Sequence, residues 1–521
     1  MSWTRRDVLR LTGMTAGAVA GWSLLAACGS SSDGSAGPVE GAGTAAPRRG
    51  GTVRLAFAGG GAGESLDPFA AYSPADLVRG LVLFDRLFNV LDGAPSPALA
   101  VSAEPAADAM SFTLTLRQNV TWHDGSPLTA ADVAYSLAYL TGPGRTFASE
   151  LPAYLDIERV SADGELTLTV PTLRPVGDPA TLLAGAAMTV IKEGTTSFSP
   201  GEVLGTGAFR VTAFEAGREA RLTRYEDYWG GPAPADELVI VSVDEAQARV
   251  NAAQGGQVDY ASDIPYTAAR TGAGAAGLEV RDAGAGHRHG YGFVLNTTRE
   301  LMADPRVRMA LRLGVDRQAL VDTVFLGYGT PGNDLFGHGA QYFADGIPAL
   351  ERDTDRARAL LAEAGADGAR LTIRSGDYEV GLNASTELFV EQLRELGLDA
   401  RAQIVSSTEY FDPEGIAAAD ALAFTLGPFL LHVIYNRSAA FPSLAFEDEE
   451  LEQALADAAA ATREGERARA WRAAQEVMAD RGNWVVWGLG DVLSLAREDL
   501  TGVEVRESPK YPYVGEAGFT A

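Results

Sequence analysis

Residues 112–140 read FTLTLRQNVTWHDGSPLTAADVAYSLAYL, and this stretch decides how the remaining sequence is interpreted. Phe112, Leu114 and Leu116 alternate with polar residues, and a period of two predicts a strand with one face on a hydrophobic core. His-Asp-Gly follows at 123–125, where glycine adopts the positive φ of a tight turn at little cost. The first half of the stretch therefore predicts a strand that leads into a turn.

The second half of the stretch predicts a helix that begins at Ala130. Thr129 precedes it as an N-cap, and Asp132 lies three residues later, near the positive end of the helix dipole. Apolar residues then recur at i, i+4 and i+7 from Val133, which is the spacing of one helix face.

In this order, the strand, the Trp-x-Asp-Gly turn at 122–125 and the Leu-Thr-Ala-x-Asp-Val segment at 128–133 resemble the signature of a known family. That family is the extracellular peptide/nickel solute-binding proteins (family 5), which serve ABC importers. We expect Trp122 and His123 to be structural. Other segments resemble further motifs of the family: Ser-Leu-Asp-Pro at 65–68, Gly-Thr-Gly-Ala-Phe at 205–209, Tyr-Trp-Gly at 228–230, Gly-x-Val-Asp at 256–259 and Asp-Arg at 316–317.

The resemblance implies an α/β, two-lobed fold of the periplasmic-binding-protein type, in which helices cover mixed sheets and an extra smaller domain makes three domains in all. The implied boundaries are residues 50–70 with 202–287 and 489–521 for domain I, 71–201 for domain II and 288–488 for domain III. It also implies a ligand cleft between the lobes, closed when a ligand contacts both of them.

Sequence periodicity gives a coarse map of the other elements. It predicts helices at 75–91, 305–320, 355–364 and 385–396, a helix capped by Asp244, and a largely helical tract at 446–481. It predicts strands at 50–57, 157–160, 166–170, 371–374 and 400–405, with Asp163-Gly164 as a hairpin turn.

Composition excludes some classes of partner. With 46% hydrophobic and 21% charged residues the chain is an ordinary globular sequence, but its net charge is -27. An excess of negative charge repels phosphate backbones, so we expect no nucleic acid partner.

The N-terminus predicts export. Arg5-Arg6 resembles a twin-arginine signal, and residues 11–27 form a run of 17 uncharged residues, which suits a signal peptide (1–27) better than a bilayer span. Leu-Ala-Ala-Cys at 25–28 resembles a lipobox, which makes Cys28, the sole cysteine, the lipid attachment point. Residues 28–49 are rich in Gly, Ser and Ala and predict a flexible linker between the lipid and the folded chain. We therefore expect a protein anchored by lipid to the outer face of the cell membrane.

Ligand selectivity is predicted from an acid-free stretch. Peptide binders of the family hold the ligand's ammonium with an Asp in the third domain, but here residues 421–446 contain no Asp or Glu. We hypothesise a surface formed by Phe424 and Phe429, with His432 or Arg437 facing an anionic or neutral group of a modified peptide, opine-like acid or small glycoside. The alternative is a buried strand and loop, with Arg437 on the surface.

Further aromatic residues, Tyr72, Tyr291, Phe293 and Trp487, fall where the resemblance places hinge and cleft walls, and the alternative for each is a core position. His287 and His289 have the spacing of two metal ligands on one strand, but no third ligand is evident, so we expect no metal and no cofactor.

The resemblance implies a monomeric solute-binding lipoprotein that captures a peptide-like or other small solute and passes it to an ABC permease. Two alternatives remain open: a secreted hydrolase, although Gly-x-Ser-x-Gly and His-Glu-x-x-His are both missing, and a receptor that feeds a sensor. We expect no enzymatic activity.

Overall fold

The computed structural model describes residues 47–70, 73–142, 149–272, 277–406, 409–439 and 441–520, without the side chains of 437–439. Every described residue belongs to one compact unit, Thr44–Ala521. The predicted export signal, Cys28, Tyr72 and the Arg437 side chain therefore lie outside the described part. Within the described ranges, no helix combines the length and the apolar character that a membrane crossing requires.

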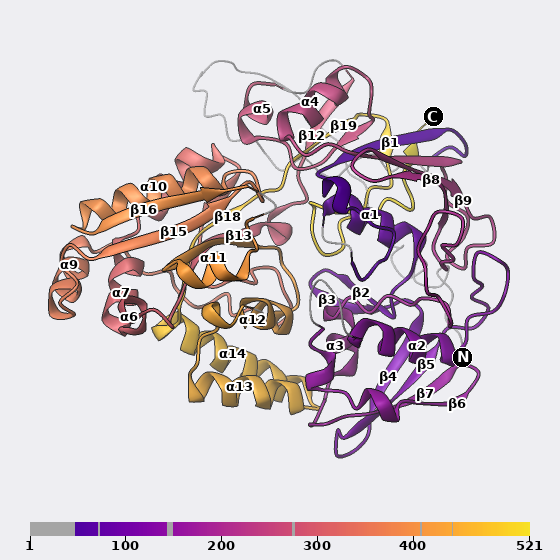
Figure 1. Ribbon diagram of the computed structural model, residues 1–521, viewed down its shortest axis with the longest axis horizontal. Helices are drawn as coiled ribbons and strands as arrows, with labels where there is room; N and C mark the ends of the chain where they lie inside the picture. Colours follow the sequence, from indigo (N-terminus) through magenta and orange to yellow (C-terminus); the bar gives the residue numbers. More distant parts are fainter. Residues whose placement is uncertain are drawn as a thin grey trace, which may run out of the picture. The chain divides into compact units, whose positions relative to one another are not determined.

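A seven-stranded mixed sheet gathers strands from distant parts of the chain (Figure 1). β1 pairs in parallel with β10 and β11, and the other pairs in the sheet are antiparallel. Its order is β12 (Leu278–Arg281), β19 (Ser494–Arg497), β11 (Tyr260–Ala261), β1 (Thr52–Phe57), β10 (Glu237–Ser242), β9 (Glu219–Arg224) and β8 (Phe209–Glu215). Helices α1 (Pro74–Leu83) and α4 (Ala246–Gln254) contact this sheet, and α5 (Tyr266–Arg270) follows β11.

A smaller antiparallel sheet is built from residues 100–171. Its order is β4 (Ala100–Pro105), β5 (Ser111–Leu116), β7 (Thr167–Pro171) and β6 (Ser161–Gly164), and it is accompanied by the ribbon β2 (Phe88–Leu91) and β3 (Ala94–Pro97). Two helices belong to the same region, α2 (Ala130–Thr141) and α3 (Pro179–Gly185) (Figure 1).

A six-stranded mixed sheet occupies most of the C-terminal half. Its order is β14 (Gly329–Pro331), β18 (Trp484–Gly490), β13 (His289–Leu295), β17 (Ala421–Leu426), β15 (Arg370–Gly376) and β16 (Asp399–Val405). Its helices are α6 (Glu300–Ala303), α7 (Pro305–Gly314), α8 (Arg317–Leu320), α9 (Thr354–Glu363), α10 (Leu382–Glu395), α11 (Pro413–Ala418), α12 (Leu431–Ala439), α13 (Glu449–Ala460) and α14 (Glu464–Arg481). α10 packs on β15, β16 and β17, and the short pair β20 (Leu500–Thr501) and β21 (Gly518–Phe519) closes the chain.

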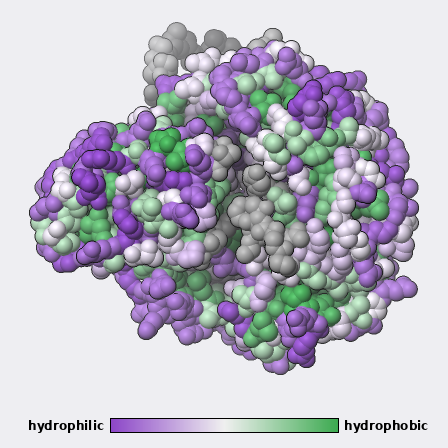
Figure 2. Space-filling view, viewed as in Figure 1, coloured by the Kyte–Doolittle hydropathy of each residue, from purple (hydrophilic) through white to green (hydrophobic). Residues whose placement is uncertain are grey.

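The outer surface is mainly hydrophilic. Hydrophilic residues cover most of the face in Figure 2, and hydrophobic residues form scattered patches. Large apolar side chains that are exposed within the described ranges are few: Val101, Met110, Leu173 and Ile404.

The stretch 112–140 folds as its sequence predicts. β5 covers residues 111–116, Gly125 turns with a φ of 83°, and α2 begins at Ala130 behind a capping box of Thr129 and Asp132. Trp122 is fully buried and donates its indole N–H to Asp132 at 3.3 Å. The structural role expected of Trp122 is confirmed.

The Gly-Thr-Gly segment at 205–207 serves a close backbone approach. A Cβ at Gly205 would lie 1.7 Å from the carbonyl oxygen of Leu83, and one at Gly207 would lie 2.4 Å from that of Val82. The segment passes against the end of α1 just before β8 begins, because no side chain stands between the two backbones.

The helix predicted at 75–91 is confirmed as far as Leu83 and is wrong beyond it. It ends at Leu83, Phe84 is extended (φ −127°, ψ 158°), and residues 88–91 pair with 94–97 as a strand. Asp85 explains the break, since its buried carboxylate accepts hydrogen bonds from Thr206 and Trp229 at 2.9 and 2.8 Å. The apolar spacing at 84–88 was compatible with a helix, but these long-range contacts select an extended chain.

Other boundaries also differ from the periodic map. Residues 157–159 form a 3-10 turn, and the first strand of that hairpin is β6 (161–164). Glu245, not Asp244, caps α4. The helix predicted at 305–320 divides into α7 and α8 because Asp316 starts a second helix as its N-cap. The tract 446–481 divides into α13 and α14, since Ala461 is extended and Arg467 binds its carbonyl oxygen at 2.7 Å.

His123 makes the fold sensitive to acid. Its Nε2 lies 3.0 Å from the Gly207 carbonyl oxygen, and its Nδ1 accepts from the Gly205 N–H at 3.2 Å, so the ring is held neutral. Burial lowers the pKa of His123 to about 4. The unfolded chain binds a proton below about pH 6.5, whereas the folded chain does not until about pH 4, so stability is lost as the pH falls between these values.

We expect His123→Gln to remove about 3 kcal/mol of the acid-induced loss in the free energy of unfolding between pH 7 and pH 4. Urea unfolding curves at several pH values measure that loss. His287→Gln, at a half-buried histidine, is the matched control and should retain the wild-type slope. Equal slopes for His123→Gln and the wild type would contradict the assignment.

Candidate functional site

A cavity lies between the segment that carries α3 and the helices α12, α13 and α14. Its volume is about 590 Å³, including the space open to solvent at its mouth. One wall is formed by Tyr154, Val176, Asp178, Thr181 and Leu182, and the other by His432, Tyr435, Asn436, Leu455, Ala458, Ala459, Arg467 and Trp471. The two walls are about 250 or more residues apart in the chain, as expected of a site between two lobes.

One set of contacts joins the walls along the backbone. The Gly177 N–H donates to the Ala459 carbonyl oxygen at 2.7 Å, and Arg467 donates to the Gly177 carbonyl oxygen at 3.1 Å. Arg467 also pairs with Asp178 at 2.9 Å. A Cβ at Gly177 would lie 2.2 Å from the Ala461 carbonyl oxygen, so glycine is what lets the two backbones meet.

A second set of contacts involves α12. His432 Nε2 lies 3.3 Å from a carboxylate oxygen of Glu150, and Asn436 donates a hydrogen bond to the same carboxylate. The His432 ring packs over Gly185, where a Cβ would lie 2.1 Å from it. Neither ring nitrogen of His432 makes a hydrogen bond to a described residue.

Among the residues proposed from sequence, His432 lines this cavity, and five aromatic residues pack elsewhere. Phe293 stacks on Phe389 with ring centroids 4.2 Å apart, and Trp487 stacks on Phe325 at 4.7 Å. Tyr291, Phe424 and Phe429 are also buried. Contact of any of these residues with a ligand stays a prediction, as it does for Tyr72 and Arg437.

The sequence alone did not identify Asp178 or Arg467 as cavity residues, or Glu150 as a neighbour of side chains on α12. Asp178 had one recognisable signal, because Asp-Pro starts a helix: it caps α3 by accepting from the Thr181 N–H at 3.1 Å. Trp471 lies in the tract predicted to be helical, and it is buried beside Tyr435.

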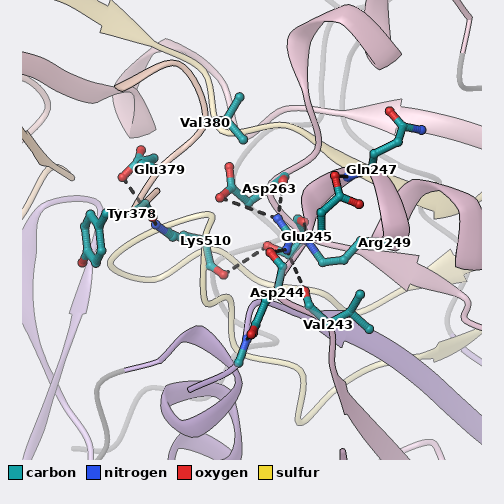
Figure 3. Close-up of polar contacts among 12 residues, drawn as sticks. Val243, Asp244, Glu245, Gln247, Arg249, Asp263, Tyr378, Glu379, Val380 and Lys510 are labelled. Atoms are coloured by element: carbon teal, nitrogen blue, oxygen red, sulfur yellow. Dashed lines mark hydrogen bonds and ion pairs between the residues drawn. The ribbon is translucent and has the colours of Figure 1, made fainter. Parts of the chain in front are cut away.

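A second polar cluster surrounds Glu379, which follows β15 (Figure 3). Its buried carboxylate lies 2.7 Å from His289 Nδ1 and accepts hydrogen bonds from Tyr291 at 3.1 Å and Thr425 at 2.6 Å. Lys510 Nζ lies 3.6 Å away. The stretch 421–446 is free of acids in sequence, but the fold brings a carboxylate to it at Thr425.

Electrostatics in this cluster favour charged partners. Burial alone would raise the pKa of Glu379, but His289 and Lys510 outweigh it and hold that pKa well below its usual range. Burial alone would lower the pKa of Lys510, but Glu379 and Asp263 outweigh it and raise that pKa. Glu379 and Lys510 therefore form a buried ion pair.

The cluster connects the large sheets. Lys510 donates to the Tyr378 carbonyl oxygen at 2.6 Å, on the side of the six-stranded sheet. Its own carbonyl oxygen accepts from Ser262 at 3.1 Å, and Arg249 of α4 donates to the Ser262 carbonyl oxygen at 2.7 Å, on the side of the seven-stranded sheet.

The paired histidines do not share a ligand. His289 faces Glu379 and Ser508, whereas Nδ1 of His287 lies 2.9 Å from the Ala283 carbonyl oxygen. Within the described residues, no three His, Cys, Asp or Glu side chains gather closely enough to hold a metal ion.

Two mixed sheets with helices around them, and a cavity walled by two parts of the chain, define a two-lobed solute-binding fold of the periplasmic type. The chain belongs to the bacterial extracellular solute-binding proteins, family 5, whose middle-region model matches residues 94–425.

Individual proteins resemble this chain in sequence or in fold. The glutathione-binding protein GsiB of Salmonella typhimurium is 23% identical over 465 residues, which cover 84% of this chain and 89% of GsiB. The binding protein DppA from Helicobacter pylori, solved with the peptide STSA, has a TM-score of 0.78 at 17% identity and covers 91% of this chain and 99% of its own. AgaA from A. tumefaciens R10, solved with agropinic acid, has a TM-score of 0.77 at 22% identity, covering 90% and 99%.

We expect Lys510→Met to lower the free energy of unfolding by about 3–5 kcal/mol, because it leaves a buried carboxylate without its lysine partner. Adding Glu379→Gln should recover part of this loss, since the double variant buries no unpaired charge. Urea unfolding of the two single variants and the double variant measures the coupling.

The control is the exposed pair Arg472 and Glu476 of α14, 2.9 Å apart. Arg472→Met should change stability by no more than about 1 kcal/mol. Additive effects of Lys510→Met and Glu379→Gln would show that the buried pair is not coupled.

Proposed function

We propose that the protein is the substrate-binding lipoprotein of an ABC importer. It captures a peptide-like or other small solute between its lobes, closes by hinge motion and delivers the solute to a membrane permease without converting it. The family assignment supports the binding role. So do three similar proteins: GsiB, whose name says that it binds glutathione, DppA, solved with a peptide, and AgaA, solved with agropinic acid.

The observation that carries the proposal is the cavity between α3 and the helices α12–α14. Both walls supply lining residues, so a solute there touches both and stabilises the closed arrangement over the open one. Opening must also break the contacts of Arg467 with Gly177 and Asp178. The ligand and these contacts therefore act on the same equilibrium.

The proposal includes the domain boundaries inferred from the sequence. Domain I comprises residues 50–70, 202–287 and 489–521, domain II residues 71–201 and domain III residues 288–488. Residue 288 directly precedes β13, and residue 489 lies at the end of β18. These two strands are neighbours in one sheet, so a hinge at these positions moves paired strands together.

Native mass spectrometry of the purified protein tests capture. We expect a noncovalent small molecule to remain bound, and Arg467→Met to retain less of it because closure loses a cross-cavity ion pair. Arg469→Met, on the exposed face of the same helix, is the matched control and should retain as much as the wild type.

A protein that binds nothing, or an Arg467→Met variant that retains the solute as well as Arg469→Met does, would contradict this proposal. Appearance of cleavage products from the released solute during incubation with fresh protein would indicate a hydrolase instead.

The proposal places the lipid anchor at Cys28, behind a twin-arginine signal. We expect Cys28→Ser to move the protein from the membrane fraction to the soluble fraction of the exporting cells. Two acyl chains anchor a protein stably, whereas the variant carries no acyl chain. Immunoblots of the fractions measure this. Ser30→Ala is the control in the same linker, and equal membrane fractions for both variants would contradict the anchor.

A further inference from the structure

We propose that the cavity between α3 and the helices α12–α14 receives an uncharged aromatic or branched aliphatic group of the solute. This inference rests on the proposed function and names the chemistry that the cavity selects. Two features of the described residues at the cavity carry it: an apolar surface, and charged side chains that already have partners.

The apolar surface comes from both walls. Val176 and Leu182 lie on one side, and Leu455 and Ala458 lie on the other. Trp471 adds an indole whose ring centroid is 5.8 Å from that of Tyr435, with 42° between their planes. Aromatic walls of this kind stabilise flat or branched apolar groups through buried area and ring contacts.

Asp178, which lines the cavity, and Glu150, which contacts two lining residues, are not available to a cation. Asp178 accepts from the Thr181 N–H at 3.1 Å and from the Thr181 hydroxyl at 2.8 Å, and it pairs with Arg467 at 2.9 Å. Glu150 is occupied by Asn436 and His432. A ligand ammonium would enter this space without a carboxylate of its own, and burying an unpaired charge is unfavourable.

The described cation at the cavity is occupied as well. Arg467 donates to the carbonyl oxygens of Gly177 and Ala461, in addition to its ion pair with Asp178. A ligand carboxylate would have to displace contacts that hold the two walls together. An uncharged group leaves every one of these contacts intact.

His432 lines the cavity without offering a charge to a ligand. Its Nε2 lies 3.3 Å from the Glu150 carboxylate, and both ring nitrogens are buried, so the 13% of the side chain that is exposed consists of ring and Cβ carbon atoms. An uncharged group leaves the contact between His432 and Glu150 intact.

Three naphthalene derivatives that share one ring system test the inference on the full, ligand-free protein: 1-naphthalenemethanol, 1-naphthoate and 1-naphthylmethylammonium. Isothermal titration calorimetry gives the affinity of each. We expect the neutral alcohol to bind about tenfold more tightly than either ion, or better. The anion also tests the alternative in which Arg437 supplies a positive charge to the site.

Two variants show where the alcohol binds. Ala459→Phe fills the cavity from α13 and should weaken binding of the alcohol about tenfold. Ala456→Phe makes the same substitution on the exposed face of the same helix and should leave binding unchanged. Leu455→Trp, which fills the same wall one turn earlier, provides a second cavity variant, and circular dichroism verifies that each variant is folded.

Failure of the alcohol to bind, equal or tighter binding of either ion, or unchanged binding to both cavity variants would overturn the inference. The proposed function is judged separately, by retention of a solute in native mass spectrometry. A protein that retains a solute but prefers an ionic naphthalene keeps its proposed function and loses this selectivity.

Discussion

The buried carboxylate of Glu379 constrains how the C-terminal half of the molecule packs. A buried charge must find partners of opposite charge and donors for its lone pairs, or the fold that buries it becomes costly. Glu379 finds them on three separate segments, through His289, Thr425 and Lys510. Each segment is thereby held at a defined distance from the others.

The constraint acts on geometry more than on net stability. A buried ion pair often contributes little relative to apolar residues of the same size, but an arrangement that separates its members leaves both uncompensated. The same reasoning applies at the cavity, where Arg467 and Asp178 pair across the two walls. In both places a charge pair specifies which surfaces may face each other, and apolar packing supplies most of the stabilisation.

Sequence was sufficient where structure is local. The strand, turn and helix of 112–140 follow from alternation, a glycine and a cap, all within a few residues. The helix at 75–91 was mispredicted because its last residues carry a helical apolar spacing and also suit a strand, and the choice is made by a pairing partner and by Thr206 and Trp229, far along the chain. Local patterns contain no information about such partners.

The candidate site was harder to predict from the sequence for the same reason. His432 stood out as a rare residue in an acid-free stretch, but the cavity exists only because residues near 178 meet residues near 467. Asp178 signalled a helix start and nothing more. Glu379 lies outside the acid-free stretch in sequence and beside it in space, so counting acids along the chain could not reveal the contact.

Lysine occurs only at positions 192 and 510, so nearly all of the 42 basic residues are arginine. Lys192 is 29% exposed, whereas the Lys510 side chain is 5% exposed within its cluster. Amine-reactive reagents thus meet one accessible lysine side chain and one that is shielded. The rate at which Lys510 becomes acylated therefore reports how often the region between the two large sheets opens, and this measurement needs no attached label.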